Sequence, residues 1–394
     1  MKIAIIGGGA SGYFCANELV KNKNNKIVIF ERLGRVLEKV KVSGGGRCNV
    51  TNSEIKITTL IKSYPRGDRF LKKAFAKFST QDTQNWFDKK GVALKTEPDG
   101  RVFPVTDKSH TITNCLRDVE QTISLRNKEN VDDIVQSGTD WIVNGESFDK
   151  VVIASGSAPK MWGILKSLGV KIISPVPSLF TFKIKDNRLD GLMGVSLPQV
   201  NMKIVGDKQK EIGGFLVTHW GLSGPVVLKL SAWKARWFYD LHYKFDLFID
   251  YIPNHSEEEI RKEFNSSTSQ KIVYNNPLYD LPKRLWKKLC ETAEIEQNKI
   301  YIELSKKQKN KLLTELKQGV YYVNGKTTFK EEFVTAGGVD LDEITGLTME
   351  HKTLKGLYFA GEVLNIDAIT GGYNFQAAWT TAWLAAQAVL NKKV

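Results

Sequence analysis

The chain has 394 residues, of which 42% are hydrophobic and 25% charged, so it falls in the soluble globular class rather than a disordered or fibrous one. At roughly 150 residues per domain, this length predicts two or three domains. The net charge is +14, and residues 1–110 carry 21 Lys and Arg against 10 Asp and Glu. Such a surplus can serve a phosphate-rich cofactor, nucleic acid or plain solubility, and charge alone does not decide among them.

Several classes of site and location are disfavoured. No apolar run approaches the roughly 20 residues of a membrane span, and Ile3–Ile6 is too short for a secretory signal. The four cysteines form no CxxC pair and the five histidines form no HxH or HxxxH pair, so we expect neither disulfides nor a metal site. We expect a cytoplasmic protein without membrane contact.

The first 31 residues have the pattern of a dinucleotide-binding unit. In chain order they give an apolar run, a glycine turn, a helix-like stretch, a second apolar run and an acid: Lys2–Ile6, Gly7–Gly12, Tyr13–Lys21, Ile27–Phe30 and Glu31. In such a turn Gly7 permits the tight bend, Gly9 lets a pyrophosphate approach the backbone and Gly12 lets the helix pack on the strand. Glu31 is then placed to accept hydrogen bonds from ribose hydroxyls.

Two later segments indicate that the dinucleotide is FAD. Residues 43–49 read Ser-Gly-Gly-Gly-Arg-Cys-Asn, which suits a loop lying against a flat ring or a phosphate. Residues 356–362 read as a strand ending in Gly-Glu, and Thr370-Gly-Gly-Tyr-Asn374 precedes an Ala-rich helix over Phe375–Leu390. Glu362 would bind a ribityl hydroxyl, and the amides near Tyr373–Phe375 would stabilise negative charge on the reduced flavin.

These motifs resemble a known family, the FAD-binding oxidoreductases that include aminoacetone oxidase-like and bile-acid dehydro-intermediate reductase-like (BaiN/YhiN-type) flavoproteins. The matching segments are spread over nearly the whole chain in the order of the family: IIGGGASG, SGGGRCNVTN, GRVFPVTDKS, FLVTHWGLSGPVVLKLS, FVTAGGV and LYFAGEVLNIDAITGGYNFQAAW. The resemblance implies a two-part Rossmann-like FAD domain that is interrupted by a β-barrel and a helical insert. It also implies that Glu31, Arg47, Cys48, Gly361, Glu362 and Asn374 surround FAD.

The middle of the chain favours the same α/β architecture. Short strands are predicted at 179–184, 200–205, 215–218 and 245–251, and two capping-box sequences at Ser256 and Ser305 predict a helical region over about 256–318. Strand character returns at 320–323 and 327–333. We therefore expect an FAD-binding domain over 1–177 and 335–394, a β-barrel over 178–254 and 319–334, and a helical insert over 255–318.

Two departures from the family limit what the resemblance implies. After the strand Val151–Ala154 the family has a Gly-Ser-Thr-Gly loop, and here that stretch is shortened and contains Trp162. Residues 364–369 read Leu-Asn-Ile-Asp-Ala-Ile where the family more often has Asp and Gly. We carry over no named substrate for this reason.

The expected site combines the glycine segments, the strand ends and the last helix. The predicted cofactor-binding residues are Gly7, Gly9, Ser11, Gly12, Glu31, Arg32, Ser43, Gly45, Arg47, Cys48, Asn49, Ala154, Gly156, Gly361, Glu362, Gly372, Tyr373, Asn374 and Phe375. For proton transfer to the substrate we name His219 and Tyr373. Cys48 has no nearby partner cysteine, so we expect it to pack rather than to perform disulfide chemistry.

The predicted function is hydride transfer between NAD(P)H, the flavin and a small unsaturated or carbonyl-bearing molecule. The chain has no second complete GxGxxG motif, so NAD(P)H would dock transiently. An oxygen-using amine oxidase is the runner-up. An RNA-associated flavoprotein is a third alternative, since tRNA-modifying flavoproteins share this architecture and the N-terminal third is basic, although no RNA-binding module is recognisable. The sequence predicts no particular oligomeric state.

Overall fold

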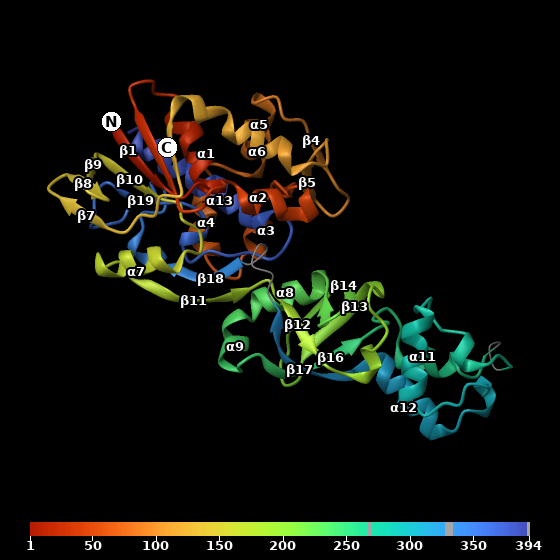
Figure 1. Ribbon diagram of the computed structural model, residues 1–394. Helices are drawn as coiled ribbons and strands as arrows, with labels where there is room; N and C mark the ends of the chain where they lie inside the picture. The colour runs from red at the N-terminus through yellow and green to blue at the C-terminus, as the bar shows by residue number, and fades with distance from the viewer. Residues whose placement is uncertain (267–269, 328–333, 392–394) are drawn as a thin grey trace. The chain divides into compact units, whose positions relative to one another are not determined.

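The computed structural model describes residues 1–266, 270–327 and 334–391. The chain divides into two units, Met1–Ser178 with Phe329–Val394, and Leu179–Thr328. Figure 1 shows the helices and strands of each unit along the chain.

The first unit is built on a parallel sheet of five strands in the order β19–β10–β1–β2–β6. These strands are Leu357–Phe359, Lys150–Ile153, Lys2–Ile6, Lys26–Glu31 and Ser124–Asn127. In the central strand, Ile3 lies opposite Ile27 on one side and Lys150 on the other. The interiors of β1, β2 and β10 are apolar and buried, as expected where both faces of a parallel sheet are covered.

Two helices that lie far apart in the sequence pack against each other in this unit, α1 (Ala10–Leu19) and α13 (Tyr373–Val389). Both are buried along most of their length, and the small side chains of α13 permit a close approach. The other helices of the unit are α2 (Glu38–Val42), α3 (Ile57–Leu60), α4 (Asp68–Phe75), α5 (Thr80–Lys89), α6 (Ser109–Arg117) and α7 (Pro159–Ser167).

Three small antiparallel sheets complete the first unit. They are β3–β5–β4 (Thr51–Asn52, Arg101–Pro104, Leu94–Thr96), β7–β8–β9 (Ile134–Ser137, Asp140–Val143, Glu146–Phe148) and β11–β18 (Ile172–Ser178, Val334–Val339). The last of these pairs the strand that leaves the unit with the strand that re-enters it, Ser178 facing Val334.

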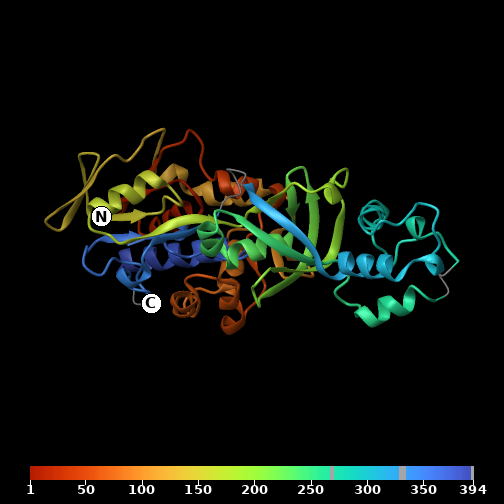
Figure 2. The same cartoon turned by 90° about the horizontal axis from the view of Figure 1, so that it is seen from below.

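The second unit contains a closed barrel of six strands in the order β12–β15–β14–β13–β16–β17. Its strands are Thr181–Ile184, Gly221–Ser223, Lys210–Thr218, Ser196–Ile204, Lys244–Asp250 and Gly319–Thr327. Helices α8 (Pro225–Trp233), α9 (Ala235–Asp240), α10 (Glu257–Glu263), α11 (Lys283–Thr292) and α12 (Lys306–Gln318) belong to the same unit. Barrel and helices share one hydrophobic core, and both views show α12 running into β17 (Figures 1 and 2).

The helical region differs in part from the prediction. The capping boxes are present, Ser256 with Glu259 at α10 and Ser305 with Gln308 at α12. Residues 270–282, by contrast, hold only a short 3-10 turn at Val273–Asn275, because Pro277 and Pro282 interrupt the helical pattern. Most of the predicted strand 327–333 lies outside the described residues.

The predicted fold class is confirmed: a two-part Rossmann-like α/β domain is interrupted by a closed barrel and helices. The separation of barrel and helical insert into two domains with the predicted bounds stays a prediction. No helix within the described parts of the chain is long and apolar enough to cross a membrane.

Candidate dinucleotide-binding site

The first glycine turn is shaped by close backbone contacts on either side of one open position. Gly7 has φ +118°, and a Cβ there would lie 2.4 Å from the Ala154 carbonyl oxygen. A Cβ on Gly12 would lie 2.0 Å from the Gly7 carbonyl oxygen. At Gly9, the N-cap of α1, no described atom beyond its chain neighbours and its own helix lies within 4 Å of a built Cβ, and no side chain caps the helix. The first amides of α1 therefore face open space, which is the arrangement that binds a phosphate.

Glu31 ends β2 beside this turn and is held by two backbone amides. Its Oε2 accepts from the Gly8 N–H at 2.8 Å, and its Oε1 accepts from the Leu33 N–H at 2.8 Å. Each carboxylate oxygen keeps a further lone pair, so Glu31 can still accept from ribose hydroxyls. The neighbouring Arg32 is exposed.

The ends of β10 and β19 bring buried hydroxyls together with a carboxylate. Ala154 is buried, Gly156 has φ +59°, and a Cβ on Gly156 would lie 3.7 Å from Glu362 Oε2. Glu362 accepts from the Thr335 N–H at 3.1 Å and from Lys39 Nζ at 2.5 Å. The hydroxyls of Ser155 and Thr335 are buried and have no hydrogen-bond partner among the described residues.

An unpartnered buried hydroxyl costs roughly 1–3 kcal/mol, so such groups usually have a partner that supplies the missing hydrogen bond. The polyhydroxyl and pyrophosphate parts of FAD offer such partners. Bound FAD would account for the two unpartnered hydroxyls of Ser155 and Thr335 and for the open space at Gly9. An ordinary glycine turn requires neither feature.

The second glycine-rich segment packs against the N-terminus of α13. Gly372 has φ +88°, and a Cβ there would lie 2.3 Å from the Thr51 carbonyl oxygen. With its amide turned to satisfy its neighbours, Asn49 accepts from the Gly372 N–H at 2.8 Å. The Trp379 indole N–H donates to the Val50 carbonyl at 2.9 Å. Segments more than 300 residues apart in sequence thus form one loop–helix junction.

Within that segment, Ser43–Gly46 forms a 3-10 turn in which Gly45 has φ +68° and open space around a built Cβ. The Ser43 hydroxyl donates to the Val40 carbonyl at 2.9 Å. Cys48 is fully buried, and burial raises the pKa of its thiol to about 12. The thiolate is therefore scarce at neutral pH, in agreement with a packing role.

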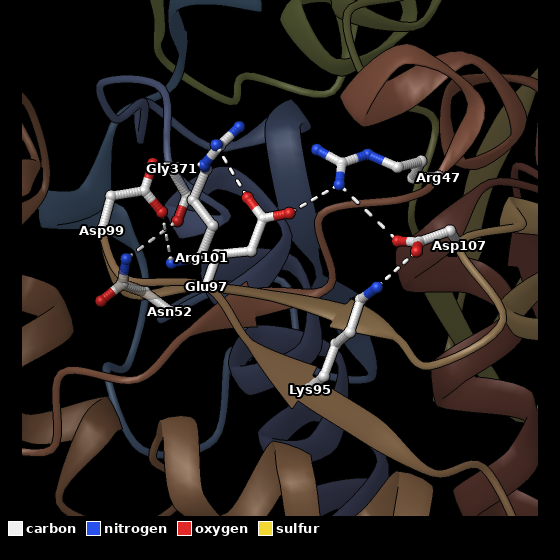
Figure 3. Close-up of polar contacts among 8 residues, drawn as sticks. All are labelled: Arg47, Asn52, Lys95, Glu97, Asp99, Arg101, Asp107 and Gly371. Atoms are coloured by element: carbon white, nitrogen blue, oxygen red, sulfur yellow. Dashed lines mark hydrogen bonds and ion pairs between the residues drawn. The ribbon is translucent and has the colours of Figure 1, made fainter.

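Arg47 lies in a cluster of alternating charges over the β3–β5–β4 sheet (Figure 3). Its guanidinium carbon lies 3.9 Å from the centroid of the Phe103 ring, and it donates to Glu97 at 2.6 Å. Arg101 binds Glu97 from the other side at 2.8 Å. Asp107 pairs with Lys95 and lies 3.6 Å from Arg47, and the hydrogen bond from Lys95 lowers the pKa of Asp107. These contacts occupy Arg47 with protein partners.

The predicted residues at the start of α13 hold the loop before it. Asn374 clamps Ala368 from both sides, accepting from its N–H at 3.0 Å and donating to its carbonyl at 3.1 Å. The Tyr373 carbonyl accepts from the buried Tyr64 hydroxyl at 2.7 Å, and Phe375 stacks on Trp379 at 5.5 Å. The first-turn amides of α13 follow Gly372 without a side-chain cap.

Gly361 joins the two FAD-domain helices. It has φ +76°, its N–H donates to Thr381 at 2.9 Å, and a Cβ there would lie 2.0 Å from Ser11 Oγ on α1. Gly361 thus links the end of β19 to both helices. The side chain of Arg47 is engaged with Glu97 and Phe103. Cofactor binding by the predicted residues stays a prediction.

The two predicted proton donors lie in different units. Tyr373 is half-buried at the α13 junction, with its ring centroid 6.1 Å from that of Tyr64. His219 is exposed in the turn between β14 and β15 of the second unit, next to Trp220. A catalytic role for either residue stays a prediction.

Sequence reasoning missed a buried ion pair in the loop before α13. Arg66 makes a two-pronged pair with Asp367, which is fully buried and also accepts from the Ser178 hydroxyl at 2.8 Å. It likewise missed Ser155 and Thr335. The sequence showed only that residues 364–369, which include Asp367, differ from the family pattern. Its partner Arg66 lies 301 residues away in the chain.

A parallel sheet with a glycine turn, a free helix N-terminus and an acid at the end of the second strand defines a dinucleotide-binding protein of the Rossmann class. The model of the HI0933-like protein Rossmann domain matches residues 1–388, and the chain belongs to this family.

Curated relatives match along the full length. The ribosomal RNA dihydrouridine synthase of Haemophilus influenzae is 29% identical, covering 98% of this chain and 97% of that protein. The protein of the same name from Escherichia coli is 29% identical, over 99% and 98%. The 3-dehydro-bile acid delta(4,6)-reductase of Clostridium scindens is 27% identical, over 99% of both chains.

Solved structures share the fold. A flavocytochrome c3 fumarate reductase has a TM-score of 0.50 at 14% identity, covering 99% of this chain and 78% of that one. A 3-ketosteroid delta1-dehydrogenase from Sterolibacterium denitrificans has a TM-score of 0.50 at 10% identity, over 99% of both chains. At these identities the solved structures show the fold alone. The predicted class, an FAD-dependent oxidoreductase, is supported by the family match and by the full-length reductase relative.

Proposed function

We propose that the protein is an FAD-dependent reductase that saturates a C=C bond conjugated to a carbonyl group, with NAD(P)H as the hydride donor. The observation that carries this proposal is the chemistry shared by its full-length relatives. A uracil ring that becomes dihydrouracil and a dehydro-bile acid that loses a double bond both gain two hydrogens across an alkene next to a carbonyl. Conjugation makes the far carbon of the alkene able to accept hydride.

The residues of the first unit divide the binding of FAD among them. The amides at the start of α1 and the open space at Gly9 suit the pyrophosphate, and Glu31 suits the ribose. Ser155, Thr335 and Glu362 offer hydrogen bonds to the polyhydroxyl chain, while the amides opening α13 suit the edge of the ring on which negative charge collects when the flavin is reduced. When bound, FAD supplies two-electron hydride chemistry.

The reaction needs one hydride and one proton. The hydride adds to the alkene carbon remote from the carbonyl, the π bond breaks, and the proton adds to the carbon next to the carbonyl. Tyr373 at the α13 junction is the proposed proton donor in the first unit, and His219 is the alternative from the second.

For the substrate we place a uracil base in RNA first. Two relatives that cover almost the whole chain carry the name of an rRNA enzyme. The net charge of +14 suits a polyanionic partner, and residues 179–328 alone carry 24 Lys and Arg against 17 Asp and Glu.

A small carbonyl-conjugated alkene, the class predicted from sequence, is the second candidate. It is favoured by the bile-acid reductase relative, which is 27% identical over the full chain. Amine oxidation, the runner-up reading, has no relative of that name among the three described above.

The test is a steady-state assay with purified holoprotein, NADH or NADPH, and one acceptor at a time. The acceptors are ribosomal RNA from cells that lack the corresponding gene, and a 4,6-dienone steroid. We expect NAD(P)H consumption to require an acceptor, with dihydrouridine appearing in the digested RNA. Steroid reduction without dihydrouridine would select the second candidate. Failure of both acceptors, with rapid flavin reduction by an amine, would overturn the proposal.

A further inference from the structure

Helices α11 and α12 of the second unit pack together and leave an open cleft beside α12. The cleft has a volume of about 700 Å³ and is lined by polar side chains, chiefly Thr292, Lys306, Lys307, Asn310, Lys311 and Thr314. Five of these six lie on α12 at spacings of one, four, five and eight residues from Lys306, so they share one face of the helix.

The opposite face of α12 accounts for the stability of the helix pair. Leu312, Leu313 and Leu316 are buried in the core of the second unit, together with Leu285 and Trp286 of α11. The cleft face contributes no apolar side chain to that core. Core packing therefore does not dictate the residues of this face, and they can serve to bind a ligand.

The cleft face is basic, because its lining holds three lysines, Lys306, Lys307 and Lys311, against one acid, Glu315. Neither α11 nor α12 has an acid in its first turn, whereas the first turn of α10 holds Glu257–Glu259. Lysines at the N-terminus of a helix oppose the helix dipole, so Lys306 and Lys307 weaken α12 unless an anion is bound there.

Protein carboxylates only partly neutralise these lysines. Glu294, which is exposed, lies 2.5 Å from Lys311 and 3.5 Å from Lys307. Lys306 makes no ion pair within the described residues, and Glu315 at the end of the cleft is held at 2.7 Å by Arg188. Exposed ion pairs are worth at most about 1 kcal/mol, so a phosphate can displace Glu294.

The chemistry of the lining indicates what the cleft binds. It offers ammonium, amide and hydroxyl donors and contains no aromatic or apolar side chain. Phosphates and sugars are bound by Lys, Asn and Thr of this kind, while unstacked bases need aromatic platforms. The cleft therefore suits a nucleic-acid backbone rather than a base or a steroid.

We propose that the α11–α12 cleft docks the phosphate backbone of the RNA substrate, independently of sequence, while the flavin site acts on the base. This inference rests on the proposed function in its RNA form. It assigns the second unit a part in substrate binding that neither the dinucleotide motifs nor the barrel explains.

The test uses the triple variant K306Q/K307Q/K311Q of the full-length holoprotein. Glutamine keeps the length and helix propensity of lysine but removes the charge. The matched control is K23Q/K26Q/K166Q, which removes three exposed lysines of the first unit that have no ion pair among the described residues. The probe is a fluorescein-labelled RNA hairpin with uridines in its loop, and affinity is measured by anisotropy over a series of salt concentrations.

We expect the cleft variant to bind the hairpin roughly tenfold more weakly or worse, and its plot of log affinity against log salt to be shallower by about two units, since each lost phosphate contact removes roughly 0.7–0.9. The control variant keeps the affinity and the slope of the parent. FAD content and flavin reduction by NAD(P)H stay at parental values in both, which excludes misfolding as the cause.

Two failures are distinguishable. If the parent forms dihydrouridine and the cleft variant binds the hairpin with unchanged affinity and slope, the cleft assignment is wrong and the proposed function stands. If the parent neither binds the hairpin nor modifies RNA, the RNA function falls and the cleft assignment falls with it.

Discussion

At Gly9 a side chain would enter open space in front of α1, whereas at Gly7 and Gly12 it would meet backbone atoms. Asp is also a preferred N-cap residue. Gly9→Asp should therefore fold with at least parental stability and still lose FAD, because its carboxylate occupies the place of the pyrophosphate. The measurement is the flavin-to-protein ratio after gel filtration, together with the urea midpoint.

Gly163→Asp is the matched control, since Gly163 is exposed on α7 and also has open space around a built Cβ. It should keep FAD. Stoichiometric FAD in Gly9→Asp would show that the pyrophosphate lies elsewhere.

Cys48 offers a second test at the residue scale. Because burial raises the pKa of its thiol to about 12, the thiol stays protonated near neutral pH and should resist alkylation in the folded protein. Cys48→Ala should keep flavin reduction by NAD(P)H within about twofold of the parent in stopped-flow traces. Loss of reduction with FAD still bound would reveal thiol chemistry.

Residues whose role depends on local spacing could be predicted from sequence. Gly7, Gly9 and Gly12 and the acid at Glu31 follow from a strand–turn–helix–strand unit of fixed length. The engagement of Arg47 with Glu97 could not be predicted, because Glu97 lies 50 residues away on another sheet. The same holds for the pair of Arg66 and Asp367.

At the scale of elements, the Arg66–Asp367 pair ties the loop before α13 to Ser178 at the end of β11. Removing Arg66 leaves the fully buried Asp367 carboxylate without its counter-ion, and an unpaired buried charge typically costs about 3–5 kcal/mol. Arg66→Ala should therefore lower the free energy of unfolding by about that amount in urea titrations. Ser178→Ala, which removes only one hydrogen bond, should cost less than half as much. Equal losses in the two variants would contradict this assignment.

The capping box of α12 could be predicted because its signal lies within four residues. Ser305→Ala should destabilise the second unit by about 1 kcal/mol, since the N-cap hydroxyl accepts from the Gln308 N–H at 3.2 Å. Ser305→Thr should recover most of the loss. FAD content should be unchanged, because the cofactor residues lie in the first unit. A parental urea midpoint in Ser305→Ala would contradict the role of the cap.

The helical region between α10 and α11 was predicted less well. Capping signals mark where helices begin, but the chain from 270 to 282 contains two prolines and instead packs through 3-10 and turn geometry. The burial of Val273 and Leu278 in the core fixes the course of this segment. No periodic pattern in the local sequence indicates that burial.

At the scale of the whole molecule, the two units differ in the groups that they offer to ligands. The first unit offers hydrogen-bonding groups to a dinucleotide, the carboxylates of Glu31 and Glu362 among them, and the second unit adds a basic helix pair beside a barrel. The two-part fold was implied by the resemblance to the flavoprotein family, and the predicted strands and helices of the middle of the chain favoured the same architecture. The substrate could not be predicted from motifs, because the polar side chains that bind RNA do not recur at a fixed spacing in the sequence.

The central claim is reduction of a carbonyl-conjugated alkene by the flavin, and a single-turnover experiment tests it most directly. The holoprotein is reduced without oxygen by one equivalent of NADPH or NADH, then mixed with ribosomal RNA that lacks dihydrouridine while flavin absorbance is followed. We predict that the oxidised flavin spectrum returns and that the RNA gains dihydrouridine in proportion. A flavin that stays reduced with both the RNA and the dienone steroid, yet reoxidises at once with air, would contradict the claim.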